Sequence, residues 1–356
     1  MYARWTYSAL VTLLAAGVAC GGVEIEFDYS LDTNGFFALQ QRRAVMEHAA
    51  DTLLRFTDPL DPIDPGGDDT WEAFFLHPGT GADWSVFDAQ IPVDTIRIYA
   101  GGRDLPTGVL GLTSTGVSVD GQSEWVDTVV SRGQSGALDS PPTDHGPWGA
   151  SLSFDTGQNW HLGIADQPPS GQPDLLSVAI HELSHALGFG LSDSWMTYTS
   201  DSTFTGPNAR KVFGGSVPLA DRGHWAETVE GMVGDERQSA AMTASIGFGD
   251  RKRFTDVDVA GLLDVGWTRA PLGDADRDGV VGLDDLAALS ANWDTLGTGA
   301  WKTGDFTGEG DVNQADLDLL TGNWPGAASA RLTSIPEPAT LLTLTCLLPV
   351  ALRRRR

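Results

Sequence analysis

Hydrophobic and polar positions along the first half of the chain predict several strands and one long helix. From Val23, the apolar residues of VEIEFDYS alternate with polar ones, as in a strand with one buried face. Apolar positions at helical spacing follow between residues 35 and 55. Further strands are predicted at residues 71–76, 94–100 and 150–154. Segments rich in Pro, Gly, Ser and Asp predict loops at residues 58–69 and 133–146.

The clearest helix pattern covers residues 172–188. Its apolar residues recur so densely that we expect a mostly buried helix. Pro173 and Asp174 suit the first turn, because Pro has no amide to lose and Asp favours the positive end of the helix dipole. Gly188 is expected to close the helix in the left-handed conformation.

The second half of the chain is less regular. Residues 193–222 are polar, and we expect an irregular insertion with weak structure there. Residues 255–266 predict a second helix, with Thr255 as N-cap and Asp258 three residues later, in the manner of a capping box. Its apolar stripe is expected to contain Val259, Leu262 and Leu263. An internal repeat occupies residues 274–324.

Composition and charge narrow the classes of partner. The chain has 356 residues, of which 41% are hydrophobic, so one sizeable domain with small appendages is expected. A formal net charge of −26 disfavours nucleic acid and anionic membrane surfaces, and it suits divalent cations. The two cysteines, Cys20 and Cys346, lie in terminal segments, so no disulfide is expected in the mature body.

Residues 1–20 carry the pattern of a secretory signal peptide. Arg4 is followed by a short apolar stretch from Ala9 to Val18 and by small residues before a plausible cleavage point. The stretch is too short for a stable membrane span. Acylation of Cys20, as in a lipoprotein, is the alternative. The pattern therefore predicts export.

The last 22 residues form a second processing pattern. Pro336, Glu337 and Pro338 precede an apolar run at residues 339–352, and four arginines end the chain. This arrangement resembles the PEP-CTERM sorting tail of Gram-negative bacteria, here residues 335–356. The resemblance implies processing by an exosortase and delivery to the cell surface or extracellular matrix. A plain C-terminal membrane anchor is the alternative.

The segment HELSHALGFG, which begins at His181, carries the candidate chemistry. His181 and His185 are four residues apart and share one face of the predicted helix, so both imidazoles can bind one tetrahedral zinc ion. Glu182 can accept a proton from a water that the zinc makes acidic. Two buried histidines without a partner would be costly, which argues against a purely structural role.

This segment resembles the signature of the metzincin zinc peptidases, in which a glycine, here Gly188, permits a sharp turn. The usual third ligand would fall at Leu191, which cannot bind metal. The candidates to replace it are Asp193, Glu227, Glu230 and His224. We favour His224, because leishmanolysin-like metzincins also place a long insertion before the third histidine. The resemblance covers roughly residues 148–267.

The resemblance further implies a methionine turn beneath the metal and an edge strand that pairs with extended substrate. We expect Met242 to be the turn methionine, with Met232 as the alternative and ordinary core packing as a third reading of Met242. Residues 254–267 resemble the closing helix of such domains. We expect residues 150–154 to form the substrate-binding edge strand.

The internal repeat consists of two acidic loops whose first positions, Asp274 and Asp305, lie 31 residues apart. Each loop has oxygen-bearing side chains at positions 1, 3, 5 and 12 and glycine at position 6, as in calcium loops. The candidate calcium ligands are Asp274, Asp276, Asp278, Asp285, Asp305, Thr307, Glu309 and Asp316. The repeat resembles a type I dockerin, which implies calcium binding and a cohesin partner. A stalk between enzyme and anchor is the alternative.

These patterns predict an α+β protein in four parts. A signal peptide at residues 1–20 precedes a metzincin-like domain at 23–270, with a twisted mixed sheet and an active-site helix. A small all-α calcium-loop module follows at 272–326, and the sorting segment occupies 335–356. The expected activity is zinc-dependent hydrolysis of peptide bonds in extracellular protein, with Glu182 as general base. The competing hypothesis is a catalytically inactive surface or matrix protein, displayed through its dockerin-like module.

Overall fold

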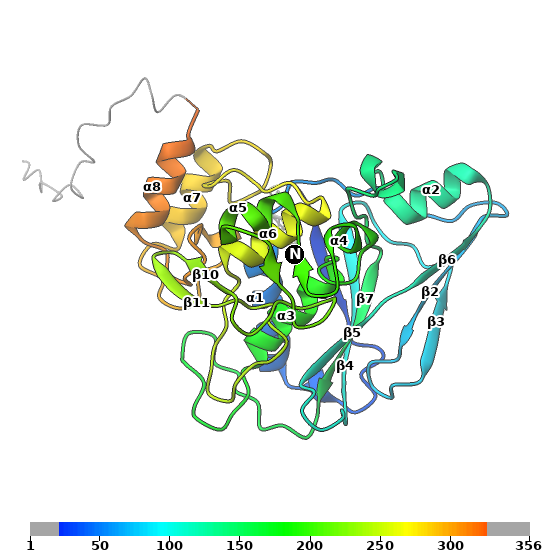
Figure 1. Ribbon diagram of the computed structural model, residues 1–356, viewed down its shortest axis with the longest axis horizontal. Coiled ribbons are helices and arrows are strands. Elements are labelled where there is room, and N and C mark those ends of the chain that lie inside the picture. Colours follow the sequence, from blue (N-terminus) through cyan, green and yellow to red (C-terminus); the bar gives the residue numbers. More distant parts are fainter. Residues whose placement is uncertain (1–20, 326–356) are drawn as a thin grey trace, which may run out of the picture.

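The structure is a computed structural model that describes residues 21–325. Within these residues, eight α-helices and eleven strands form a mixed α/β fold (Figure 1). The predicted signal peptide and the predicted sorting segment lie outside the described part of the chain. No helix between residues 21 and 325 is both long and apolar enough to cross a membrane.

A twisted four-stranded mixed sheet forms the centre of the fold. Its order is β1 (Glu24–Asp28), β4 (Thr95–Arg103), β7 (Gly149–Asp155) and β5 (Gly111–Ser114). The first three run parallel, and β5 pairs antiparallel with β7. The strands predicted near these positions are therefore confirmed, but the prediction that residues 150–154 form the edge strand is wrong. Strand β7 is paired on both sides and buried throughout, and the edge is the short polar strand β5.

A smaller antiparallel sheet flanks the first one. It contains β3 (Asp83–Phe87), β2 (Thr70–Leu76) and β6 (Val117–Asp120), and it is followed by α2 (Ser123–Ser131) and the 3-10 turn η2 (Ser135–Leu138). A buried cluster joins the two sheets: Trp71 of β2 packs with Trp148, and Trp148 packs with Tyr99 of β4. The alternation of buried and exposed positions along β2 follows from this one-sided packing.

Two helices, α1 (Gln40–Leu53) and α3 (Leu175–Ala186), pack against each other beside the central sheet. The 3-10 turn η1 (Phe36–Ala38) precedes α1. Helix α3 is buried along its whole length, as predicted. It begins at Leu175, because the Asp174 carboxylate accepts the Ser177 amide at 3.1 Å and so serves as N-cap rather than first-turn residue. Gly188 has φ of 100°, the predicted left-handed conformation.

The segment 193–222 is ordered, so the prediction of weak structure there is wrong. It contains α4 (Asp193–Tyr198), β8 (Thr203–Phe204), α5 (Pro207–Phe213) and β9 (Val217–Pro218). Two of its aromatic residues are fully buried: Trp195 stacks on Phe204 with ring centroids 4.0 Å apart, and both pack on Trp225. A mostly polar segment can therefore fold when a few large apolar side chains anchor it.

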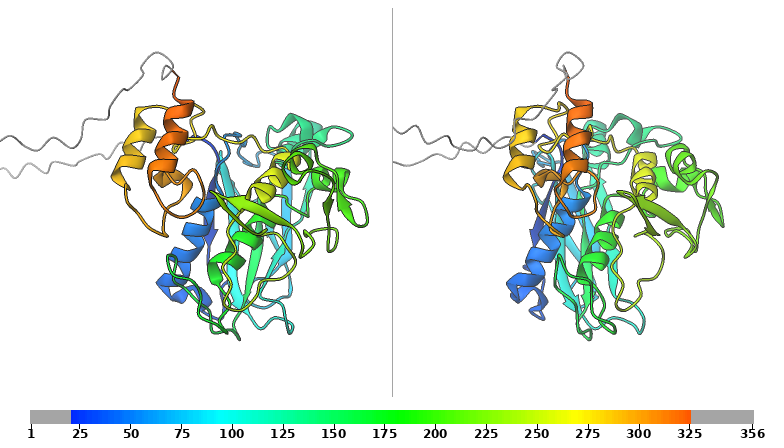
Figure 2. Two further views of the ribbon diagram at one scale, coloured as in Figure 1. Left: turned by 60° about the vertical axis from the view of Figure 1, so that its left-hand side comes forward. Right: turned by 90° about the vertical axis from the view of Figure 1, so that its left-hand side faces the viewer.

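The chain then forms the hairpin β10 (Glu230–Val233) and β11 (Glu236–Ser239), and helix α6 (Asp256–Val265). The predicted capping box of Thr255 and Asp258 is present at the start of α6. Beyond it lie α7 (Leu283–Ala291), the 3-10 turn η3 (Trp301–Thr303) and α8 (Gln314–Asn323). These elements share a small core around Trp301 and lie beside α1 (Figure 2).

Candidate metal centre

Three imidazoles meet in a cleft at the surface of the central domain. Nε2 of His185 lies 3.2 Å from Nε2 of His181 and 3.2 Å from Nε2 of His224. Metal–nitrogen bonds of about 2.0–2.1 Å in a tetrahedral site place two nitrogens about 3.3–3.4 Å apart. His181 and His185 are buried and His224 is partly buried, so this cluster could hold a metal ion.

The other candidates for a third ligand do not join this cluster. Asp193 begins α4, Glu230 begins β10, and both are exposed, as is Glu227. Leu191, which occupies the usual ligand position, lines the cleft with 46% of its surface exposed. Of the four candidates named from the sequence, the structure brings only His224 to the two helical histidines.

Gly190 allows the distant His224 to reach helix α3. Gly190 has φ of +74°, and a Cβ built there would lie 2.5 Å from the carbonyl oxygen of Gly223. The chain leaving α3 and the chain returning with His224 can pass this closely only because Gly190 has no side chain. The next residue, Trp225, is fully buried, and its indole donates to Asp258 at 3.0 Å. His224 is thus held between a close backbone crossing and a buried anchor.

The second nitrogen of each imidazole has an acceptor. Nδ1 lies 3.0 Å from the Ala241 carbonyl oxygen in His181 and 2.8 Å from that of Phe189 in His185. Because a carbonyl can only accept, each Nδ1 carries the proton and each Nε2 lone pair faces the cluster. Burial lowers the pKa of His181 and lowers that of His185 to about 4. Both rings are therefore neutral near pH 7, as metal ligands must be.

The third imidazole is oriented by a carboxylate that the sequence analysis did not identify. Nδ1 of His224 donates to Asp221, at 2.9 Å from Oδ1. Such a carboxylate fixes the ring orientation and raises the basicity of the ligand nitrogen. A histidine preceded by an acidic residue three positions earlier is a weak signal in a sequence, which is why Asp221 went unnoticed.

Replacing Asp221 with Asn is expected to weaken metal binding by about 10–100-fold, the usual effect of losing an orienting carboxylate. The Asn side chain has no negative charge, and it can turn its NH2 group, which cannot accept a hydrogen bond, toward Nδ1 of His224. Competition titration with a chromogenic chelator measures this change, with Asp193→Asn on the neighbouring exposed turn as the charge-matched control. Equal affinities of the Asp221 and Asp193 variants would exclude the orienting role.

Met242 lies in a loop that is tied to the cluster through its backbone. Its side chain is fully buried, and the Asp258 carboxylate accepts the amides of Ala241 and Met242 at 2.9 and 3.2 Å. The amide of Trp225 in turn donates to the Met242 carbonyl at 2.9 Å. The loop thereby presents the Ala241 carbonyl to His181. It also holds Trp225, the residue that follows His224.

Glu182 points into the same cleft and contacts the edge strand β5. Its Oε2 accepts a hydrogen bond from the Thr113 hydroxyl at 2.7 Å, and a Cβ built at Gly111 would lie 2.5 Å from Oε1. Burial raises the pKa of Glu182 to about 7, and the bond from Thr113 opposes that rise. Thr113 was not predicted as a site residue, because residues 150–154 rather than β5 were expected at the edge of the sheet.

The cleft itself has a volume of about 670 Å³. Its walls are largely apolar, and among the residues that line it Glu182 and the three histidines are the only titratable ones. The apolar lining residues are Val109, Leu110, Leu112, Val178, Leu191, Ala244, Ile246 and Phe248. The cleft can therefore take an uncharged, extended ligand directly over the imidazole cluster.

The first acidic loop brings three carboxylates together. Oxygens of Asp274, Asp276 and Asp278 lie within 4.8 Å of one another, so this cluster could also hold a metal ion. Asp274 is fully buried, and its Oδ1 has no hydrogen-bond partner. Burial and the nearby Asp285 carboxylate raise the pKa of Asp274 to about 6. A buried oxygen without a partner is costly, and a cation would satisfy it.

The second acidic loop is arranged differently. The Asp305 carboxylate accepts the amides of Gly308 and Gly310, and Glu309 accepts from the Asn313 side chain. Asp316, like Asp285 in the first loop, accepts backbone amides of its own loop. Within the described residues, carboxylates at positions 1, 3 and 5 come together in the first loop. In the second loop, the Thr307 hydroxyl at position 3 donates to Asp305 Oδ1 at position 1, at 3.1 Å. The calcium role of the eight residues stays a prediction.

The residues between 21 and 325 thus contain two groups that could hold a cation, one of imidazoles and one of carboxylates. The imidazole group opens into the cleft beside Glu182, whereas the carboxylate group lies in the small C-terminal module. Comparison of the chain with models of protein families, with curated proteins and with solved structures gives no match.

Proposed function

We propose that the protein is a zinc-dependent endopeptidase. The observation that carries the proposal is the convergence of three imidazoles beside a buried carboxylate in an open cleft. Imidazole donors suit zinc, and three protein ligands with one open position are typical of catalytic rather than structural zinc sites. A zinc ion held there would supply Lewis-acid chemistry, polarising a carbonyl oxygen and lowering the pKa of a water.

Glu182 serves as general base in this proposal. Its carboxylate accepts the proton of the attacking water and returns it to the leaving amine, so that one group assists both bond formation and bond cleavage. Without a cation, burial raises the pKa of Glu182 to about 7, and such a rise favours a group that must both take and release a proton near neutral pH. The Thr113 hydroxyl holds one carboxylate oxygen and leaves the other for the water.

The edge strand β5 supports an extended polypeptide as substrate. Among the described strands it pairs only with β7, so its other edge is available for a further strand. A peptide added there would run past Glu182, because Thr113 and Gly111 of β5 both lie against that side chain. The apolar walls of the cleft favour uncharged side chains around the scissile bond.

We also propose that the C-terminal module holds calcium in its two acidic loops. Clustered carboxylate oxygens are the ligands that calcium prefers, and the unpaired buried oxygen of Asp274 supplies a reason for a cation there. Binding of a cohesin-like partner and export to the cell surface or matrix remain part of this proposal, on the sequence patterns alone.

Cleavage of an unfolded protein tests the proposed activity. The full-length protein, loaded with one equivalent of zinc, is expected to cut reduced casein into peptides whose new termini mass spectrometry identifies. Treatment with 1,10-phenanthroline should stop cleavage, and added zinc should restore it. If the zinc-loaded protein leaves casein and a random peptide library intact, the inactive surface protein becomes the better account.

The pH dependence of hydrolysis should show the titration of Glu182. The carboxylate must be deprotonated to accept a proton, so kcat/KM is expected to rise with pH as Glu182 loses its proton, at a pKa that a bound zinc cation lowers from about 7. Because the Thr113 hydrogen bond lowers the pKa of Glu182, Thr113→Val should move this acidic limb to higher pH, and Thr113→Ser should move it back. If kcat/KM rises at the same pH in the unmodified protein and in both variants, the Thr113 hydroxyl does not affect the pKa of Glu182.

A further inference from the structure

The acidic module, residues 272–325, packs against the domain that carries the histidine cluster. Arg277 in the first acidic loop is buried and donates to the Val23 carbonyl and to the Glu24 carboxylate at the start of β1. Lys302 forms an ion pair with Asp51 of α1 at 2.7 Å. Figure 2 shows the two helices of the module standing over α1. The module is therefore a part of the folded body and not a separate appendage.

The second acidic loop touches the β10–β11 hairpin. At the hairpin turn, the Gly234 amide donates to the Thr307 carbonyl at 3.2 Å, and a Cβ built at Gly234 would lie 2.6 Å from Glu309 Oε2. Arg55 is buried at the same junction, with its guanidinium 5.4 Å from the Trp301 ring centroid. The position of the hairpin turn thus depends on the conformation of this loop.

The hairpin leads directly to the histidine cluster. Strand β11 ends at Ser239, and two residues later the Ala241 carbonyl accepts from Nδ1 of His181. Within β11, the Gln238 side chain donates to the Arg253 carbonyl at 3.1 Å. A shift of the hairpin would therefore move the acceptor that orients one of the three imidazoles.

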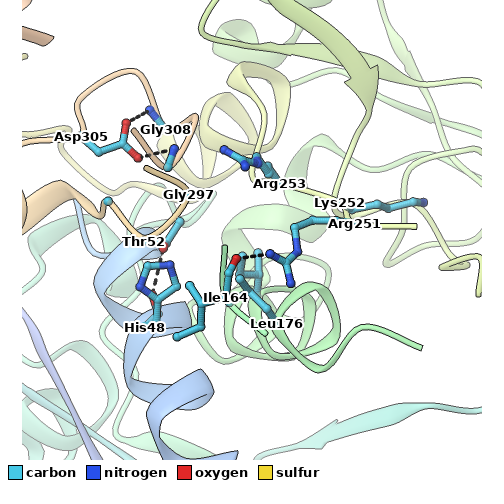
Figure 3. Close-up of a pocket in the computed structure, with 13 residues that line it drawn as sticks. His48, Thr52, Ile164, Leu176, Arg251, Lys252, Arg253, Gly297, Asp305 and Gly308 are labelled. Carbon is cyan, nitrogen blue, oxygen red and sulfur yellow. Dashed lines mark hydrogen bonds between the residues drawn. The ribbon is translucent and has the colours of Figure 1, made fainter. Parts of the chain in front are cut away.

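A second connection runs through residues 251–253. Arg251 forms a buried ion pair with Asp174, the N-cap of α3, at 2.8 Å, and the Lys252 amide donates to Ser177 in the first turn of that helix. Arg253 lines a small cavity of about 30 Å³ between the module and the domain. Figure 3 shows Asp305, Gly308 and Gly297 of the module on one side of this cavity, with His48 and Thr52 of α1 on another and Arg253 beside them.

The acidic loops carry electrostatic strain that a cation would relieve. Oxygens of Asp274, Asp276 and Asp278 lie within 4.8 Å of one another, and the buried Asp274 Oδ1 has no hydrogen-bond partner. Without a cation, several carboxylates are held close together in partly desolvated loops. A divalent cation removes this repulsion and orders the loops, as metal binding commonly does in small acidic modules.

We propose that calcium binding to the acidic loops strengthens metal binding at the histidine cluster, through the β10–β11 hairpin and residues 251–253. This inference rests on the proposed metals of the two sites. Because coupling between two sites is reciprocal, zinc at the histidines must tighten calcium binding by the same factor. A ligand at one coupled site commonly changes the affinity of the other site by about 5–150-fold, and we expect a change of about 10-fold here.

Two readouts on the full-length protein test the coupling. The dissociation constant of zinc, measured by competition with a chromogenic chelator, should fall about 10-fold when calcium chloride is added. In the zinc-free protein, hydrogen exchange of residues 230–243 should slow on adding calcium. Asp305→Asn in the second loop and Asp278→Asn in the first should each reduce both responses, and Asp318→Asn, on the exposed side of α8, should keep both.

The outcomes separate this inference from the proposed function. If calcium binds by calorimetry but changes neither the zinc affinity nor the exchange of the hairpin, the coupling is wrong and the peptidase proposal stands. If zinc binds at no calcium concentration, the peptidase proposal fails. Hydrogen exchange of residues 230–243 in the zinc-free protein then still shows whether calcium orders the hairpin. If calcium does not slow this exchange, the proposed connection between the acidic loops and the hairpin is wrong as well.

Discussion

Glu182→Gln is expected to reduce kcat for peptide hydrolysis by about 10²–10⁴-fold, the range that general acid–base catalysis contributes. The amide has the size of the carboxylate but cannot accept a proton from water. The metal centre should survive, because Glu182 is not a member of the histidine cluster and the Thr113 hydroxyl can still donate to an amide oxygen. A fluorogenic peptide assay gives kcat, and atomic absorption gives the zinc content of the same sample.

The matched control for this change is Glu227→Gln. Glu227 is exposed and lies three residues after His224, so the substitution makes the same charge change close to the centre but outside the cleft. Its kcat should equal that of the unmodified protein. Hydrolysis by the Glu182 variant at more than a tenth of the normal rate would contradict the role of Glu182 as general base.

His224→Ala is expected to remove zinc from the purified protein, although His181, Glu182 and His185 stay in place on α3. Two imidazoles leave the cation with half of a tetrahedral shell, whereas catalytic zinc sites use three protein ligands. The loss of affinity should exceed the about 10–100-fold change expected for an orienting residue such as Asp221. Metal analysis after dialysis measures the zinc content, and competition titration measures the affinity for zinc.

Asp193→Ala and Glu230→Ala are the controls for His224, since each removes another candidate ligand from an exposed position. Both variants should retain one zinc per chain. If the His224 variant keeps its zinc and one of these two loses it, a different third ligand holds the metal. Circular dichroism of all three variants separates loss of metal from loss of fold.

The sequence predicts well those elements that are determined by residues close together in the chain. The dense apolar run of α3, the left-handed Gly188 behind it and the capping box at Thr255 are properties of neighbouring residues, and the structure contains all three. The spacing of His181 and His185 also follows from the helix alone.

The parts that were missed depend on contacts between distant segments. Strand β5 is short, and its place at the sheet edge is decided by pairing with β7, whose paired residues lie 37 to 43 positions further along the chain (Ser114 with Ser151, Gly111 with Phe154). Segment 193–222 folds because Trp195 and Phe204 bury themselves against Trp225, which average polarity does not reveal. Asp221 and Thr113 matter only because the fold brings them to His224 and Glu182.

Zinc K-edge X-ray absorption of the full-length protein tests most directly whether three imidazoles share one cation. We expect a shell of three imidazole nitrogens at about 2.0–2.1 Å with one oxygen ligand completing a four-coordinate site. In His224→Ala, any zinc still bound should show no more than two imidazoles. A native spectrum with two imidazoles or with oxygen ligands alone would contradict the metal centre and, with it, the proposed hydrolysis.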